Sequence, residues 1–208
     1  MRTENSAMAD PWNRWPAVEY YSAEVKDLGL GRVLRNYYLI WWPLSVAVLL
    51  PLSILFTSML VPGPRTVDSL QPAFLFAAVA VMGVSWIYLI KRVRTAVIPY
   101  DPDVLSLLDR PQRRAVRRQI FGRIQLHPEQ PQVARAAAVQ LRKKLAEQLI
   151  FASYLIPFIA GWQLSLEPLW FWMFTVLGAV LLAVTILDLR RFVLTGRFLE
   201  RTAPGKEG

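Results

Sequence analysis

Six arginines lie within fourteen residues near the middle of the chain, in the stretch RPQRRAVRRQIFGR at positions 110–123. A guanidinium group stays charged near neutral pH and forms paired hydrogen bonds to phosphate and carboxylate groups. This density therefore predicts a site that binds anions. The candidate binding residues are Arg110, Arg113, Arg114, Arg117, Arg118 and Arg123.

Other residues that could do chemistry are few. No cysteine occurs, which excludes disulfides, thiolate metal sites and cysteine nucleophiles. The one histidine, His127, has no second histidine with which to hold a metal. Asp101 and Asp103 could hold a hard cation, although helix capping explains Asp101 equally well. We therefore expect a non-catalytic protein without metal or cofactor. A membrane enzyme is the third hypothesis, and it would require a cytoplasmic site around Asp101 and Asp103.

The hydrophobic composition indicates a membrane protein. Apolar residues make up 54% of the sequence and the mean hydropathy is +0.32, which is high for a soluble domain. A helix of about twenty apolar residues crosses a bilayer. Four runs of about that length occur, at 37–61, 73–90, 149–166 and 169–187. The sequence thus predicts an all-α integral membrane protein with four transmembrane helices, arranged as two hairpins with a cytoplasmic helical middle segment.

Basic residues predict the orientation, because Lys and Arg near the ends of spans are retained in the cytoplasm. Of the 24 Lys and Arg residues, only Arg65 lies in the connection between two spans of a hairpin. Both termini are therefore expected in the cytoplasm and the spans in the inner (plasma) membrane. No cleavable signal peptide is expected, since no apolar region precedes the first span. The predicted segments are 1–36 (cytoplasmic), 37–90 (first hairpin), 91–148 (basic and helical), 149–187 (second hairpin) and 188–208 (cytoplasmic tail).

Aromatic residues gather at the predicted ends of the spans, where amphipathic rings favour the membrane interface. The predicted inner belt consists of Tyr37, Tyr38, Trp41, Trp42, Trp86 and Tyr88, and the outer belt of Trp162, Trp170 and Trp172. Both belts agree with the orientation that the charges predict.

The middle segment carries signals for helices. Asp109 is a suitable N-cap and Gly122 a suitable stop for a helix that bears the arginines. Apolar residues recur every fourth position from Val133 to Leu145, and no breaker precedes the third span. One continuous helix is therefore predicted from about residue 129 to beyond residue 151.

The arginine helix has two distinct sides. On a helix that turns about 100° per residue, the first five arginines fall within an arc of roughly 140°, with Val116 and Ile120 beside it. Anionic lipids of the inner leaflet and an acidic membrane-protein partner both fit this basic face. No nucleic acid is expected, because neither aromatic interleaving nor a nucleic-acid motif accompanies the arginines. Retention of the segment in the cytoplasm is the simplest alternative role.

Prolines and small residues suggest further sites within the spans. Pro43 and Pro157 each remove a backbone donor and free a carbonyl, which predicts a kinked cleft between the hairpins, whereas ordinary helix packing is the alternative. Small residues spaced by four favour close helix approach, in an antiparallel bundle or at the seam of a homo-oligomer. The two pairs are Ala73 with Ala77 and Ala179 with Ala183.

The ends of the second and fourth spans are alike. The stretches YLIKRVRTAVI and ILDLRRFVLTGRF each join an apolar run to a basic doublet and an apolar-basic extension. An internal duplication and independent selection for anchoring at the inner leaflet both explain this likeness.

The stretch LLDRPQRRAVRRQIFGRIQLHPEQPQVARAAAVQLRKK resembles the segment between paired spans in uncharacterised actinobacterial membrane proteins. The shared features are a basic helix, a glycine turn, a link with proline and an Ala-rich helix. The resemblance covers about forty residues with the flanking spans, and it implies no activity and no site residue.

Together these patterns predict a non-catalytic multi-pass membrane protein. It acts as an accessory or scaffold component that docks anionic lipid or an acidic partner through its basic segment. The competing hypothesis is a small transporter or lipid-handling protein that uses the cleft at Pro43 and Pro157. The four spans contain no internal charged residue, which argues against proton-coupled transport.

Overall fold

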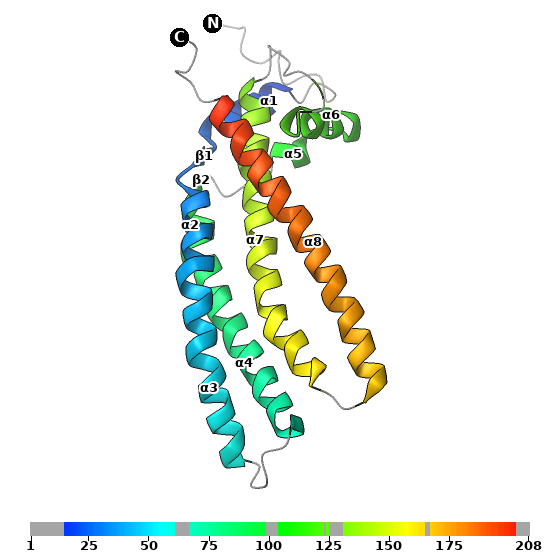
Figure 1. Ribbon diagram of the computed structural model, residues 1–208. Coiled ribbons are helices and arrows are strands. Elements are labelled where there is room, and N and C mark those ends of the chain that lie inside the picture. Colours follow the sequence, from blue (N-terminus) through cyan, green and yellow to red (C-terminus); the bar gives the residue numbers. More distant parts are fainter. Residues whose placement is uncertain are drawn as a thin grey trace, which may run out of the picture. The chain divides into compact units, whose positions relative to one another are not determined.

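The computed structural model describes residues 15–60, 67–98, 104–122, 124, 131–164 and 167–202 (Figure 1). The described part is helical apart from short connections and one two-stranded ribbon. Its helices are α1 (Trp15–Glu24), α2 (Leu30–Asn36), α3 (Trp42–Leu60), α4 (Val67–Tyr88), α5 (Val104–Leu107), α6 (Arg110–Ile120), α7 (Pro131–Gln163) and α8 (Pro168–Arg201). The remaining elements are the π-helices η1 (Tyr37–Trp41) and η2 (Leu89–Val93), the 3-10 helix η3 (Arg94–Ala96), and the strands β1 (Lys26–Asp27) and β2 (Val97–Ile98).

Within the described residues, four helical stretches are long and apolar enough to cross a membrane, which confirms the predicted helical fold with four such helices. They are Leu30–Leu60, Leu70–Ala96, Pro131–Gln163 and Pro168–Arg201. The predicted continuity of the third span with the preceding helix is also confirmed, since α7 runs without interruption through 33 residues. The last helix is longer than its apolar run, because α8 continues from residue 187 to Arg201 through a basic stretch without a proline.

The elements pack as two compact units. The basic unit comprises residues 1–30, 96–144 and 191–208. The apolar unit comprises residues 31–95 and 145–190. α7 and α8 contribute residues to both.

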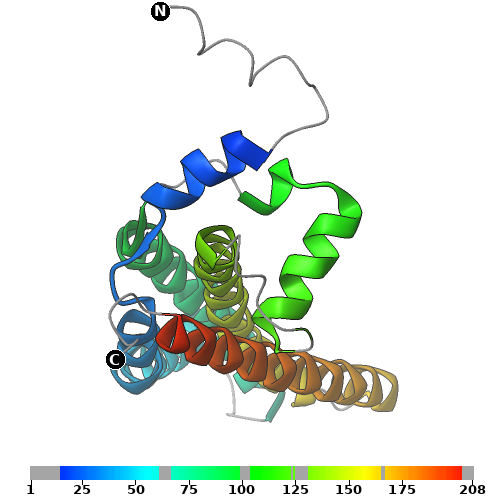
Figure 2. The same cartoon turned by 90° about the horizontal axis from the view of Figure 1, so that it is seen from above.

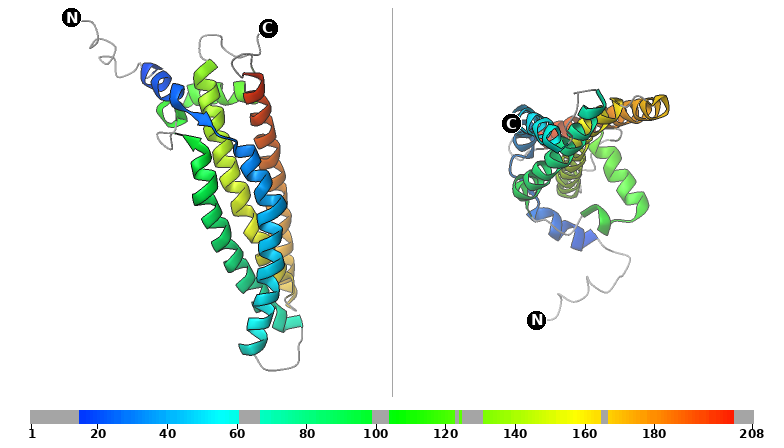
Figure 3. Two further views of the ribbon diagram at one scale, coloured as in Figure 1. Left: turned by 90° about the vertical axis from the view of Figure 1, so that its left-hand side faces the viewer. Right: turned by 90° about the horizontal axis from the view of Figure 1, so that it is seen from below.

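In the apolar unit, α3 and α4 lie side by side (Figure 3). Phe56 and Phe76 meet edge to face between them, with ring centroids 5.6 Å apart. The two small-residue pairs are used differently: Ala73 and Ala77 are buried, whereas both alanines of the pair on α8 are exposed. Only the pair on α4 therefore supports packing inside the unit.

Gly161, on α7, lies close against α4. A methyl group added to its Cα would lie 2.8 Å from Cβ of Phe74 and 3.5 Å from the carbonyl oxygen of Gln71. Neither atom can move away by rotating a flexible side chain. The absence of a side chain at Gly161 therefore sets the distance between these two helices.

Replacing Gly161 by alanine is expected to lower the stability of the apolar unit by about 1–2 kcal/mol, because overpacking outweighs the gain in helix propensity. Gly83, on α4, is the matched control, since a methyl group there meets nothing within 4 Å. Gly83→Ala should stabilise by about 0.5–1 kcal/mol through its helix propensity. Unfolding by SDS in mixed micelles measures both, and equal effects of the two changes would contradict the close contact.

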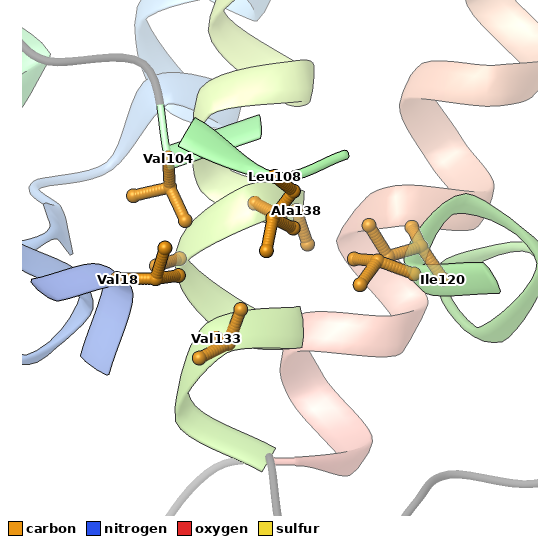
Figure 4. Packing of buried hydrophobic residues seen from close by; sticks show 9 residues of the cluster. Val18, Val104, Leu108, Ile120, Val133 and Ala138 are labelled. Atoms are coloured by element: carbon orange, nitrogen blue, oxygen red, sulfur yellow. The ribbon is translucent and has the colours of Figure 1, made fainter. Parts of the chain in front are cut away.

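In the basic unit, α1, α5 and α6 surround the first turns of α7 (Figure 2). Their buried apolar side chains meet in one cluster (Figure 4), formed by Val18, Val104, Leu108, Val116, Ile120, Val133 and Ala136–Ala138. The amide of Val104 donates to Oε1 of Gln140 at 2.7 Å, which attaches the start of α5 to α7. The antiparallel ribbon pairs Lys26 with Ile98 and Asp27 with Val97.

Candidate functional sites

Local signals determine where the arginine helix begins and ends. At the N-terminus, the amide of Asp109 donates to Oε1 of Gln112 at 3.0 Å, one half of a capping box. At the C-terminus, Gly122 has φ +68° and its amide donates to the carbonyl of Gln119 at 3.0 Å. The predictions that Asp109 caps this helix and that Gly122 ends it are confirmed.

The apolar side of α6 is occupied within the basic unit. Val116 and Ile120 are 5% and 2% exposed and belong to the cluster with Val104, Leu108 and Val133 (Figure 4). An amphipathic helix that inserts into a membrane needs its apolar face free. In this packing, α6 cannot insert in that way.

Four arginines remain exposed on the other side of α6, namely Arg110, Arg114, Arg117 and Arg118. At 100° per residue they cover an arc of about 100°. We call these four residues the basic face. Arg117 and Arg118 lie in the last turn, where positive charge interacts favourably with the helix dipole.

The other two candidate arginines differ from the basic face. Arg113 is half-buried, and its side chain is held by the chain itself: Nε donates to the carbonyl of Leu108 at 2.7 Å and Nη2 to that of Ser106 at 3.0 Å. It therefore joins the turn before α6 to the helix. Arg123 lies outside the described residues.

The structure shows a use for the carbonyl that Pro157 frees. A proline cannot donate to the carbonyl four residues earlier, which here belongs to Ser153. Trp42 supplies the missing donor, because its Nε1 lies 3.2 Å from the Ser153 oxygen. Pro157 is itself buried, whereas Pro43 is exposed. The freed carbonyl thus joins the first span to the third, and the cleft between the hairpins stays a prediction.

Pro43 lies two residues after the end of the π-helix η1. The amide of Trp42 donates to the carbonyl of Tyr37, five residues earlier, and Pro43 is the next residue. A proline ring clashes with the carbonyl four residues before it in a regular α-helix. The wider turn of η1 gives that ring room, and the first span continues as α3.

A buried group of hydroxyls joins three helical segments of the apolar unit. The hydroxyl of Tyr37, at the start of η1, lies 2.7 Å from Oγ of Ser85 on α4 and 2.6 Å from Oγ of Ser153 on α7. All three side chains are buried. We call this group the hydroxyl junction.

The hydroxyl junction has fewer protons than contacts. Oγ of Ser85 also lies 2.7 Å from the carbonyl of Val81, and Oγ of Ser153 lies 2.6 Å from the carbonyl of Ile150. Three hydroxyl protons therefore serve four short contacts, so one contact lacks a proton in any arrangement. None of the three is an acid or a base near neutral pH. The junction can thus hold the three helical segments together.

The residues of the predicted inner aromatic belt differ in their exposure. Trp41 and Trp86 are exposed, whereas Tyr37 and Tyr88 are buried, so the assignment of these two tyrosines to the belt is wrong. Their hydroxyls find partners inside the unit, since Tyr88 donates to the carbonyl of Val33 at 2.8 Å. Burial of a tyrosine costs little when its hydroxyl is hydrogen-bonded, as it is at both positions.

A second polar contact, between Asp27 and Arg142, lies in the basic unit. Oδ2 of Asp27 lies 2.9 Å from Nη1 of Arg142, and the Arg142 guanidinium sits 4.6 Å from the ring centre of Phe192. Oδ1 of Asp27 accepts the amides of Gly29 and Leu30 at the start of α2. One carboxylate thus caps a helix and pairs with an arginine on α7.

Sequence reasoning missed the hydroxyl junction and the Asp27–Arg142 pair. Pro157 signalled that the carbonyl of Ser153 needs an outside donor, but nothing local indicated that Trp42 provides it. Asp27 two residues before a glycine is a capping signal that could have been recognised. Its arginine partner is 115 residues away in the chain.

No group of three histidine or carboxylate side chains that could hold a metal occurs among the described residues. Asp101, Asp103 and His127 lie outside those residues. Comparison with protein-family models, with curated proteins and with solved structures finds no match to this chain.

Proposed function

We propose that this protein is a non-catalytic, multi-pass membrane protein that serves as an accessory or scaffold component. Its basic face docks an anionic surface, supplied by lipid or by an acidic partner. The observation that carries the proposal is the division of α6: Val116 and Ile120 are buried, and all four arginines of the basic face are exposed. The packed side holds the helix in place, and the charged side is left for a partner.

The proposed topology places two hairpins in the inner membrane, with both termini and the basic unit in the cytoplasm. The distribution of Lys and Arg supports it, because only Arg65 lies in a connection between paired spans. Because the chain has no cysteine, single-cysteine variants can test it. Ala115→Cys should react with an impermeant maleimide only in opened cells, and Glu167→Cys in intact cells. The opposite pattern would contradict this orientation.

The docking role is tested by gentle-detergent affinity purification from native membranes at low and raised salt, with identification of the proteins and lipids that copurify. Reversal of the whole basic face to glutamate should abolish the salt-sensitive association without blocking insertion, because attraction becomes repulsion at four positions. Arg197→Glu with Arg201→Glu is the control, since both arginines are exposed on α8 in the same unit. Salt-insensitive association that survives the reversal would refute the docking role.

A further inference from the structure

We propose that the basic face docks on the phosphate groups of anionic phospholipids in the leaflet that adjoins the basic unit, by charge alone and without insertion. This inference rests on the proposed docking function and names its partner. It follows from what α6 exposes, what it buries and how rigidly it is held.

The exposed arc of α6 consists of charge without apolar anchors. Besides the four arginines, its exposed residues are Pro111 and Ala115, and no acidic residue occurs within the helix. Protein interfaces take most of their affinity from buried aromatic or large aliphatic side chains at their centre. α6 offers none on this side. A planar array of phosphates needs no such anchor, since each nearby arginine contributes attraction independently.

The helix fixes the backbone positions of the four arginines. The capping contact between Asp109 and Gln112 stabilises the first turn of α6, and the Arg113 side chain joins the helix to the preceding residues. The burial of Ile120 packs α6 within its unit. The four charges therefore occupy about 12 Å along one helix axis, at 1.5 Å per residue. Little backbone entropy remains to be lost on docking, compared with a flexible basic loop.

The same packing determines the mode of contact. Val116 and Ile120 face the cluster around Val133, so no apolar side chain of α6 is free to enter the acyl region. Since the spans anchor the chain in the bilayer, the headgroups lie at high effective concentration around the basic unit. Purely electrostatic docking then suffices, and it weakens as salt screens the charges.

The test uses the full-length chain in nanodiscs, labelled with a fluorophore at Ala115→Cys on the exposed arc. Discs of phosphatidylcholine alone are compared with discs that also contain phosphatidylglycerol. Quenching by acrylamide should be weaker in the anionic discs, and this protection should vanish at raised salt. Bromine atoms on the acyl chains should leave the fluorescence unchanged, because the label stays outside the hydrocarbon.

Two double variants make the comparison specific. Arg114→Glu with Arg118→Glu should lower the ratio of docked to undocked protein at least about 25-fold, at about fivefold for each arginine. Arg197→Glu with Arg201→Glu changes the net charge by the same amount and should leave the protection in place. If both variants lose the protection from acrylamide, the protection depends on net charge alone, and its assignment to α6 is overturned.

The remaining outcomes separate this inference from the proposed function. Equal acrylamide quenching in neutral and anionic discs, or quenching by the acyl bromines, overturns the inference. If quenching is equal but an acidic protein copurifies and depends on Arg114 and Arg118, the docking function stands and its partner is a protein. If neither the protection in anionic discs nor the copurification of a protein depends on these arginines, both proposals fail.

Discussion

Replacing Tyr37 by alanine is expected to destabilise the apolar unit by about 3 kcal/mol, toward the lower end of the range for aromatic-to-alanine changes in protein cores. The ring is 1% exposed and lies against Tyr38 and Tyr88, with centroids 5.2 and 5.1 Å away. Its removal leaves a cavity where three helical segments meet. The cost stays below the upper values because the reference environment is lipid rather than water.

The hydroxyl of Tyr37 contributes less than its ring. Tyr37→Phe should cost about 1 kcal/mol, the usual size of one interhelical hydrogen bond in a membrane. Ser85 and Ser153 each keep a backbone carbonyl as acceptor, so neither hydroxyl is left unpaired. Because one of the four contacts in the junction already lacks a proton, removal of the Tyr37 hydroxyl costs less than two full hydrogen bonds.

The midpoint of unfolding by SDS in mixed micelles measures both changes at Tyr37. Tyr20→Ala is the matched control, because Tyr20 is 68% exposed on α1 and its truncation should change stability by less than about 0.5 kcal/mol. Equal effects of Tyr37→Ala and Tyr20→Ala would show that the junction does not stabilise the helices.

Replacing Arg142 by alanine should destabilise the basic unit by about 2–3 kcal/mol. The partly exposed ion pair with Asp27 accounts for about 1 kcal/mol and the contact with Phe192 for about 0.5–1 kcal/mol. The remainder comes from lost packing, since a methyl group at Gly196 would lie only 3.2 Å from Nη2 of Arg142. The arginine therefore fills the space that this glycine leaves on α8.

Substitutions at Asp27 separate its two roles. Asp27→Asn keeps an oxygen for the amides of Gly29 and Leu30 but removes the charge, so it should cost only the ion pair. Asp27→Ala removes both roles and should cost about 2 kcal/mol.

A double-mutant cycle with Arg142→Ala and Asp27→Ala should give a coupling energy of about 1 kcal/mol that falls as salt is raised. Hydrogen exchange of the amides in β1 and β2 provides the measurement, because these strands lie beside the pair in the same unit. Strictly additive effects of the two alanine changes would mean that Asp27 and Arg142 act independently.

Much of the helical architecture follows from local sequence. The four spans appear as long apolar runs, and the α6 boundaries follow from Asp109 and Gly122. The continuity of α7 follows from an apolar stripe with no breaker. Hydropathy, helix periodicity and capping all act within a few turns of chain, which is why a single sequence suffices to predict them.

The two-residue strands β1 and β2 were not predictable in this way. Each is too short to show an alternating pattern, and their pairing joins segments about seventy residues apart. The inward position of Tyr37 was missed for a related reason. Its type and place at the end of a span fit an interfacial ring as well as a buried one, and only the serines on two other helices decide between them.

By itself, the sequence determined that this chain is helical, that four helices are apolar enough to span a membrane, and that six arginines are concentrated near its middle. Tertiary structure alone decided which side of α6 is free, that Trp42 takes the carbonyl freed by Pro157, and that Asp27 pairs with Arg142. The physical reason is the distance along the chain over which each interaction acts. Helix formation and hydropathy depend on neighbours in the chain. The two contacts instead join residues more than a hundred positions apart, and the free side of α6 depends on which surface a distant helix covers.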